Sequence, residues 1–357
     1  MKKSLLGFSY EEIENVVLNL KQQKFRAKQI FELTYAGFQI DEMTNLSKEL
    51  RKTLSENYVA NPVSILKKIV SKDKTTKFLY KLQDGNVIEG VLMSYKYGNT
   101  ICVSTQVGCR MGCKFCASGL NGLLRNLDAS EILGQVLAVN RELGGTKDDR
   151  KICNIVLMGS GEPLDNYDEV AKFLKLVNEK FCLNISERNI SLSTCGLPEK
   201  IRKLADDGFS VTLTISLHAS NDEIRKKVMP IANRYCLKDV IDSAKYYFKK
   251  TGRRVVFEYA MIKGLNDSFD CATELKQLLK GFPTHINLIP LNSVAERGLV
   301  GTDKKQVYAF LSKLESLGMS ATVRRTMGED IEGACGQLRN KFLSENNVWK
   351  INFYDNI

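Results

Sequence analysis

Residues 102 to 118 read C-V-S-T-Q-V-G-C-R-M-G-C-K-F-C-A-S. Within this stretch, Cys109, Cys113 and Cys116 have the spacing C-x3-C-x2-C, and the aromatic Phe115 directly precedes the last cysteine. Three thiolates on so short a loop can converge on one soft metal centre. A [4Fe-4S] cluster normally takes four thiolates, so three leave one iron with an open position for a substrate. The spacing therefore predicts an iron–sulfur site of this kind.

Structural zinc is the alternative metal for these cysteines. A structural zinc site takes four nitrogen or sulfur ligands and usually pairs two distant knuckles. The chain has only His218 and His285 as histidines, and it contains no second C-x2-C. The composition therefore favours the cluster over zinc.

Composition indicates a large globular protein with a basic surface. The 357 residues are 43% apolar and 26% charged, and no run of 18 apolar residues predicts a membrane span. Residues 5–8 are too short for a secretion signal. Ten cysteines in such a chain then indicate metal or catalytic thiols rather than disulfides, so we expect a cytoplasmic protein. A net charge of +11 favours a polyanionic partner such as RNA, although charge alone also fits a merely basic protein.

Residues 1–90 are predicted to form an accessory unit, and residues 91–357 the catalytic unit. Apolar spacing predicts an amphipathic helix after the N-cap residue Ser9, and further helices over 26–35 and 47–56. Six lysines lie between positions 67 and 81, interleaved with apolar residues. This segment predicts a strand pair with a basic face, which we interpret as an RNA contact surface. Most lysine runs are simply solvated, and that reading stays open.

From about Asn99 onward, short apolar strands alternate with helices, which predicts βαβ units and a parallel sheet. The expected strands are 99–105, 152–158, 189–194, 211–217, 254–262, 285–291 and 320–325. The expected helices are 129–143, 166–180, 198–207, 237–250, 269–280 and 303–317. Six or seven strands are too few for a closed eight-stranded barrel, so the predicted fold class is α/β, an open partial (β/α)6 barrel. Ligands of such folds gather at the carboxyl ends of the strands.

Polar or glycine-rich clusters follow five of these strands. They are 159–166 (G-S-G-E-P-L-D-N), 193–196 (S-T-C-G), 216–218 (S-L-H), Asn292, and 326–337 (T-M-G-E-D-I-E-G-A-C-G-Q). Gly159 and Gly161 would let the backbone approach a ligand closely. In the last cluster Cys335 lies between glycines and near Arg324 and Arg325, which predicts an exposed thiol made nucleophilic by nearby cations. All five clusters are expected at one rim of the barrel.

The cysteine loop after a strand resembles the cluster loop of radical S-adenosylmethionine (SAM) enzymes. In that superfamily SAM chelates the open iron and is cleaved to a 5′-deoxyadenosyl radical. The resemblance makes Cys109, Cys113 and Cys116 the cluster ligands. It also implies SAM contacts at Gly161, Glu162, Ser193, Ser216, Leu217, His218 and Asn292. For His218 alone, a structural histidine would be the ordinary interpretation.

Five motifs occur in order along the chain: C-V-S-T-Q-V-G-C, G-E-P-L-D-N, S-L-H-A, M-P-I and G-A-C-G-Q. Together they resemble the RlmN family of dual-specificity RNA adenine-C2 methyltransferases, and the resemblance extends over essentially the whole chain. This resemblance implies methylation of carbon 2 of an adenosine in the peptidyl-transferase region of 23S rRNA and in tRNA anticodon loops. Cys335 would carry the methyl group, Glu89 would accept a proton, and Cys102 would resolve the adduct by forming a disulfide.

The same resemblance implies the cofactors and partners. They are one [4Fe-4S] cluster, two SAM molecules per turnover, 23S rRNA, tRNA, and an electron donor such as flavodoxin or ferredoxin, with a monomeric enzyme. The nearest alternative is the adenine-C8 rRNA methyltransferase of the antibiotic-resistance type, whose members usually have alanine where this chain has Pro163. A radical SAM activase or peptide-modifying enzyme would not need Cys335. An RNA-binding protein with a structural metal would be no enzyme at all.

Overall fold

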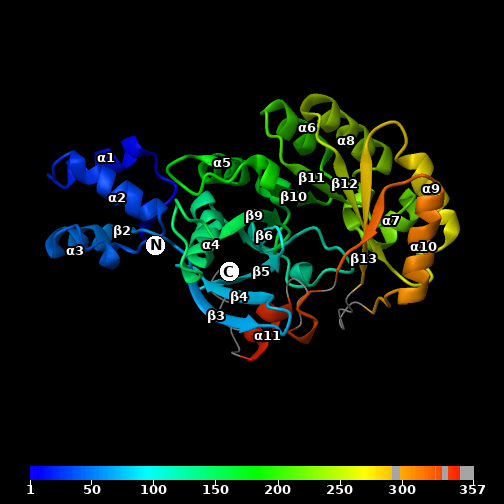
Figure 1. Cartoon of the computed structure of the whole chain (residues 1–357), viewed down its shortest axis with the longest axis horizontal. Helices are drawn as coiled ribbons and strands as arrows, with labels where there is room; N and C mark the ends of the chain where they lie inside the picture. Colours follow the sequence, from blue (N-terminus) through cyan, green and yellow to red (C-terminus); the bar gives the residue numbers. More distant parts are fainter. Residues whose placement is uncertain (292–297, 326, 332–336, 346–357) are drawn as a thin grey trace, which may run out of the picture.

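The computed structural model describes residues 1–291, 298–325, 327–331 and 337–345. Its centre is a ten-stranded sheet with the order β14-β13-β12-β11-β10-β9-β6-β5-β4-β3. Figure 1 shows this sheet curving through the molecule, with most helices on its outer side and α1 to α3 set apart at one end. Among the described residues, no helix is both long and apolar enough to cross a membrane.

Seven strands of the sheet are parallel and form the barrel. They are β6 (Gly98–Cys102), β9 (Ile152–Leu157), β10 (Ile190–Thr194), β11 (Thr212–Ser216), β12 (Val255–Met261), β13 (Thr284–Pro290) and β14 (Ala321–Val323). The helices that connect them are α4 (Ala129–Glu142), α5 (Tyr167–Asn178), α6 (Pro198–Asp206), α7 (Asp222–Val228), α8 (Leu237–Thr251), α9 (Phe269–Leu278) and α10 (Lys304–Ser316). Because β6 pairs with β5 and not with β14, the barrel is open. The predicted open (β/α)6 barrel is confirmed.

The local sequence explains why these elements form. The barrel strands are largely apolar on both faces, as expected for parallel strands covered by helices, and in β12 all residues but Val256 are buried. Polar N-cap side chains begin the helices: Asp128 accepts from the N–H of Glu131 at the start of α4, and Asp303 accepts from the N–H of Gln306 at the start of α10.

Three antiparallel strands extend the sheet beyond β6. They are β3 (Ser64–Val70), β4 (Thr76–Lys81) and β5 (Val87–Tyr95). The predicted strand pair is therefore present, but its basic face is interrupted. Lys77 is fully buried and lies 3.9 Å from the carboxylate of Glu89. The predicted basic face lacks this lysine, because Lys77 alternates onto the sheet face that α11 (Gln337–Glu345) covers.

The N-terminal helices form a compact group. They are α1 (Tyr10–Asn19), α2 (Phe25–Tyr35) and α3 (Lys48–Asn57), with the short pieces β1 (Lys3–Ser4), η1 (Ile40–Glu42) and β2 (Tyr58–Val59). Ser9 and Glu12 form a capping box at the start of α1. Phe31 and Tyr35 of α2 pack against Phe181, and their ring centroids lie 4.6 and 4.9 Å, respectively, from that of Phe181. The proposed boundary at residue 90 stays a prediction.

The remaining elements are short and surround the strand ends. They are β7 (Gln106–Gly108), η2 (Ala117–Gly119), β8 (Leu123–Asn126), η3 (Pro163–Asn166), η4 (Glu187–Asn189), η5 (Pro230–Asn233) and η7 (Glu329–Ile331). After η7 the chain returns to the antiparallel strands, and Leu338 of α11 packs beside Leu79 and Val87. Figure 1 shows α11 next to β4 and β5, far along the chain from them.

Candidate active site

The cysteine loop is closed at its base by the hairpin β7–β8. The backbone N–H of Cys109 donates to the carbonyl oxygen of Gly122 over 2.8 Å. Gly108 has φ +87°, and a Cβ there would lie 2.1 Å from that same carbonyl oxygen. Only glycine allows this close approach, so the glycine at position 108 lets the two ends of the loop bond to each other.

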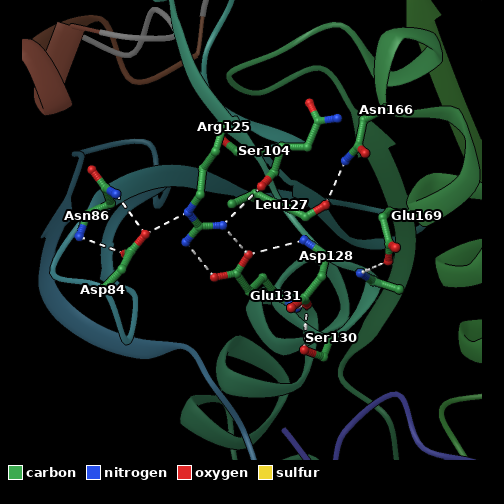
Figure 2. A network of polar contacts seen from close by, with 12 residues as sticks. Asp84, Asn86, Ser104, Arg125, Leu127, Asp128, Ser130, Glu131, Asn166 and Glu169 are labelled. Atoms are coloured by element: carbon green, nitrogen blue, oxygen red, sulfur yellow. Dashed lines mark hydrogen bonds and ion pairs between the residues drawn. The ribbon is translucent and has the colours of Figure 1, made fainter. Parts of the chain in front are cut away.

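A polar network fixes this hairpin to the rest of the protein (Figure 2). The guanidinium of Arg125 on β8 donates to Asp84, in the turn between β4 and β5, over 2.6 Å. It also donates to both carboxylate oxygens of Glu131 on α4, at 2.7 and 2.8 Å. Asn166 donates to the carbonyl oxygens of Leu127 and Thr105. Three separate elements therefore hold the strand that follows the cysteine loop.

A cavity of about 250 Å³ lies at the carboxyl ends of the barrel strands. Its lining includes most of the residues that the sequence predicted for SAM and the cluster, together with Phe115 and Gly159: the predicted ones are Cys109, Cys113, Gly161, Glu162, Ser193, Ser216 and His218. Leu217 is buried and Cys116 is half-buried, and neither of them lines it. The topology thus brings segments more than a hundred residues apart to one cavity, and the roles of the individual residues stay predictions.

The two glycines of the G-S-G-E motif serve chain packing as well as the cavity. A Cβ at Gly159 would lie 2.7 Å from the carbonyl of Val103, and one at Gly161 would lie 2.8 Å from the backbone nitrogen of Gln106. Between them, the carbonyl oxygen of Ser160 accepts from the N–H groups of Thr105 and Gln106. Glycine is therefore required at both positions by close contact between two backbone segments. The sequence analysis predicted only the close approach of a ligand.

Glu162 is almost fully buried beneath the cavity. Its two carboxylate oxygens accept from the backbone N–H of Leu164 at 3.0 Å and of Cys195 at 2.7 Å. Burial raises the pKa of Glu162, although these hydrogen bonds oppose the shift. Burial likewise raises the pKa of the Cys195 thiol well above its usual range, and the charge of Glu162 adds to that shift. Because a carboxylate oxygen accepts more than one hydrogen bond, Glu162 can still receive an ammonium group.

Glu258 is a site residue that the sequence analysis missed. Its Oε2 accepts from the hydroxyl of Ser193 at 3.0 Å and from that of Ser216 at 3.3 Å. Its Oε1 lies 3.8 Å from Nη1 of Arg324, which also lines the cavity. The available signal was a single charged residue in an otherwise apolar strand, V-V-F-E-Y-A-M, because a buried charge requires partners.

His218 adopts the left-handed backbone conformation, with φ +55°. Its Nδ1 accepts from the N–H of Ala260 at 2.9 Å, and its ring meets Phe115 of the cysteine loop edge to face with centroids 4.4 Å apart. Burial, helped by the charge of Arg225, lowers the pKa of His218 to about 3. A neutral imidazole therefore faces the cavity and also supports the loop, so the structural and the ligand-binding interpretations of His218 are compatible.

The three loop cysteines fit an iron–sulfur cluster chemically. Burial raises the pKa of Cys109 to about 12 and also raises the pKa of Cys113, and the charges of Glu162 and Cys116 add to each shift. Bare thiolates are thus disfavoured here, whereas a metal centre deprotonates its thiol ligands. Among the described residues, no three His, Cys, Asp or Glu side chains are grouped to hold a single metal ion. A cube differs because each of its thiolates binds a different iron.

Glu89 and Cys102 lie beside the cavity, on one face of β5 and β6. Both are buried, and β5 and β6 pair Val91 with Cys102. Cys102 belongs to a small apolar cluster that also contains Met158 and Met327. Met158 is shared, because it lines the cavity as well. The two predicted catalytic residues are therefore next to the cavity and do not line it.

The chain around Cys335 is held near these residues, although Cys335 and Asn292 lie outside the described residues. Before it, Gly328 donates its N–H to Asp73 at 2.9 Å. After it, the N–H of Arg339 donates to the carboxylate of Glu89 at 3.0 Å, and Asn340 donates to the carbonyl of Ala117, next to Cys116, at 3.2 Å. Helix α11 thus connects Glu89 with the cysteine loop.

Two family models match the chain. The radical SAM superfamily model matches residues 103–270, and the model of the ribosomal RNA large subunit methyltransferase N-terminal domain matches residues 3–59. The first covers the cysteine loop and strands β9 to β12, and the second covers the helical group α1 to α3.

Whole-chain relatives agree with these models. The probable dual-specificity RNA methyltransferase RlmN of Clostridium novyi is 50% identical over 347 residues, which are 96% of this chain and 100% of the relative. The corresponding protein of Clostridium perfringens (strain 13) is 52% identical over 344 residues, 96% and 98% of the two chains. A crystal structure of a radical SAM methyltransferase from Sphaerobacter thermophilus superimposes with a TM-score of 0.88 at 39% identity, covering 94% of this chain and 98% of that one.

Proposed function

The chain belongs to the RlmN family of dual-specificity RNA methyltransferases in the radical SAM superfamily, and on that premise we propose that it methylates carbon 2 of adenosine. The substrates are an adenosine in the peptidyl-transferase region of 23S rRNA and one in tRNA anticodon loops. Two SAM molecules are used per turnover, and a protein electron donor is required.

Carbon 2 of adenine requires radical chemistry. It is an electron-poor amidine carbon, so it does not attack the methyl group of SAM as a nucleophile. When bound, the [4Fe-4S] cluster and SAM supply a 5′-deoxyadenosyl radical. Cys109, Cys113 and Cys116 hold the cluster, while the cavity formed by Gly161, Glu162, Ser193, Ser216 and His218 holds SAM, with Leu217 beside it; Asn292 is assigned to SAM by the family resemblance.

Two thiols and one carboxylate of the chain complete the reaction. Cys335 receives a methyl group from one SAM by displacement, which leaves S-adenosylhomocysteine. This methyl group then loses a hydrogen atom to the 5′-deoxyadenosyl radical, and its carbon is joined to carbon 2 of the adenine. Glu89 accepts the proton that carbon 2 loses. Cys102 then attacks the sulfur of Cys335, which forms a disulfide and releases the methylated RNA. The base edge is out of reach in folded RNA, so the adenosine has to be extruded into the site.

The position of α11 carries this proposal. The helix begins two residues after Cys335, and its Arg339 and Asn340 bond to Glu89 and to the residue after Cys116. On the other side of Cys335, Met327 packs against the small apolar cluster that contains Cys102. Both flanks of Cys335 are therefore held between the predicted proton acceptor, the resolving thiol and the cluster loop.

The test is a cysteine series with methyl-labelled SAM and a 23S rRNA fragment under anaerobic conditions. We expect Cys335→Ala to abolish labelling of the RNA, and Cys102→Ala to trap a covalent protein–RNA adduct visible on a denaturing gel. Cys236→Ala, a half-buried cysteine outside the cavity, is the matched control and should behave as the wild type. A fully active Cys102→Ala enzyme would refute the resolving role, and an active Cys335→Ala enzyme would refute the methyl carrier.

The position of the new methyl group needs its own measurement. Mass spectrometry of digested RNA separates 2-methyladenosine from 8-methyladenosine. We expect 2-methyladenosine, in line with the family. Formation of 8-methyladenosine would instead assign the chain to the antibiotic-resistance type of enzyme.

A further inference from the structure

The cysteine loop separates the catalytic cavity from a second, outer groove. Met111, between Cys109 and Cys113, lines both. The groove has a volume of about 740 Å³. The loop rests on the segment that forms its far side, since the N–H of Lys114 donates to the carbonyl of Val228 at 2.9 Å and a Cβ on Gly112 would lie 3.5 Å from Pro230. One layer of chain therefore separates the groove from the predicted cluster site.

The groove has an apolar floor and a cationic rim. The floor consists of Met111, Leu164, Leu197, Pro230 and Ile231. The rim carries Arg110, Lys200 and Arg234, and Lys114, Lys226 and Lys227 are exposed on the adjoining loop and helix α7.

The acids of the groove already have partners, and two of its cations do not pair with acids. Asp165 bonds to Arg110, and Glu199 accepts from the hydroxyl of Tyr235. Within the described part of the chain, Lys200 and Arg234 make no ion pair: Lys200 lies over the ring of Tyr167 and Arg234 over that of Tyr235. Their charges are available to a negatively charged partner.

We propose that this groove docks an acidic one-electron carrier protein, whose flavin or iron–sulfur group then lies against the cysteine loop. The inference rests on the proposed function, because only a redox-active cluster needs a donor. In the transfer the carrier loses one electron and the cluster gains it, with no bond made or broken. A small apolar floor inside a cationic rim suits such a brief encounter, since electron-transfer interfaces are small and are steered by charge.

RNA is the other polyanion that a cationic rim could bind, and the geometry disfavours it here. An adenosine in this groove would be separated from the catalytic cavity by the backbone of the cysteine loop. Single-stranded RNA is commonly held by stacking on exposed aromatic rings, but the ring of Tyr235 is already covered by Arg234. An RNA site would instead have to open into the cavity that contains Glu258 and Arg324.

The test compares two reductants on the reconstituted full-length enzyme, without RNA, by stopped-flow bleaching of the cluster absorption. Reduced flavodoxin has to dock, whereas the small cation methyl viologen, in its reduced form, does not. We expect the Lys200→Glu/Arg234→Glu variant to slow reduction by flavodoxin roughly tenfold or more at low salt, and to leave reduction by viologen unchanged. Arg110 is left intact because its partner Asp165 also holds Gln106.

A Lys249→Glu/Lys280→Glu variant is the matched control, with the same change in net charge. Both lysines are exposed and lie before strands, Lys249 before β12 and Lys280 before β13, whereas the groove segments follow the carboxyl ends of β9, β10 and β11. The control should keep the wild-type rate, and high salt should erase the defect of the groove variant. Equal slowing in both variants, or no slowing in either, would overturn the proposal. So would a groove variant that loses RNA binding but accepts electrons normally.

These outcomes are separate from failure of the proposed function. If the protein acquires no cluster absorption, or forms no methyladenosine with viologen as reductant, the enzyme assignment fails. If both are normal and only the flavodoxin result is negative, the docking groove alone is refuted. Calorimetric titration of each variant with oxidised flavodoxin gives a second measurement that does not depend on turnover.

Discussion

At the scale of single residues, His218 combines strain, burial and a fixed protonation state. Its pKa of about 3 in the folded protein lies far below the ordinary value near 6.5. Between pH 6.5 and 3, His218 therefore binds a proton in the unfolded chain but not in the folded protein. The contribution of His218 to stability is complete above pH 6.5, and it falls by up to about 1.4 kcal/mol for each pH unit below that, until pH 3.

A His218→Asn variant should remove this pH dependence. Asparagine tolerates the left-handed conformation, and its Oδ1 can replace Nδ1 as the acceptor for the N–H of Ala260. We expect the free energy of unfolding in urea to fall more steeply between pH 7 and 5 for the wild type than for the variant. Parallel pH profiles would show that His218 takes up a proton in the folded state and that its burial does not matter.

Residue patterns with fixed spacing could be predicted from sequence, and partners that depend on the fold could not. The cysteine loop and the G-S-G-E motif are local, so Cys109, Cys113 and Glu162 were identified directly, and the structure places them at one cavity. The partners of Glu258 and Lys77 depend on the pairing of β12 with β11 and on the position of α11 over β5. No local sequence pattern indicates those arrangements.

At the scale of elements, the hairpin β7–β8 depends on Arg125. Burial raises the pKa of Asp84, but the hydrogen bonds from Arg125 and Asn86, together with the charge of Arg125, outweigh it and the pKa is lowered. The guanidinium thus stabilises two carboxylates from different elements (Figure 2). We expect Arg125→Met to cost about 1–3 kcal/mol of stability, less than for a fully buried pair because the side chain is partly exposed.

Hydrogen exchange locates the effect of Arg125. Amides of Gln106–Gly108 and Leu123–Asn126 should exchange faster in Arg125→Met, and the cluster should be lost sooner to a chelator. Arg125→Lys should show an intermediate effect, since it keeps the charge but not the planar fork. Arg188→Met, at an exposed position, is the control. Unchanged exchange in the hairpin would mean that its own backbone pairing suffices.

Elements with a clear apolar period were predicted closely, and elements without one were missed. The helix expected at 198–207 is α6 (Pro198–Asp206), and the strand expected at 285–291 is β13 (Thr284–Pro290). The hairpin β7–β8, helix α7 and helix α11 were not predicted. Contacts with distant segments stabilise them, and their sequences carry little periodic signal.

At the scale of the whole molecule, the N-terminal helices and the barrel share one apolar core. Phe31 and Tyr35 on α2 pack with Phe181, which lies between α5 and β10. Arg141 on α4 bonds to Glu42 and to the carbonyl of Gly37. Because these contacts are apolar as well as ionic, we expect the helices to keep a fixed orientation relative to the catalytic cavity and not to move as a tethered module.

Phe181→Ala tests this coupling. Removing the ring should cost roughly 3 kcal/mol and should raise amide exchange in α1 and α2 more than in β9 to β13, because the lost contacts belong to that junction. Phe282→Ala removes an equally half-buried ring that packs with Phe248 and Phe257 at the far side of the barrel. That control should destabilise the protein without singling out α1 and α2. If both variants affect the helices equally, the chain unfolds as one cooperative unit and Phe181 has no special role; if neither affects them, the helices are an independent domain.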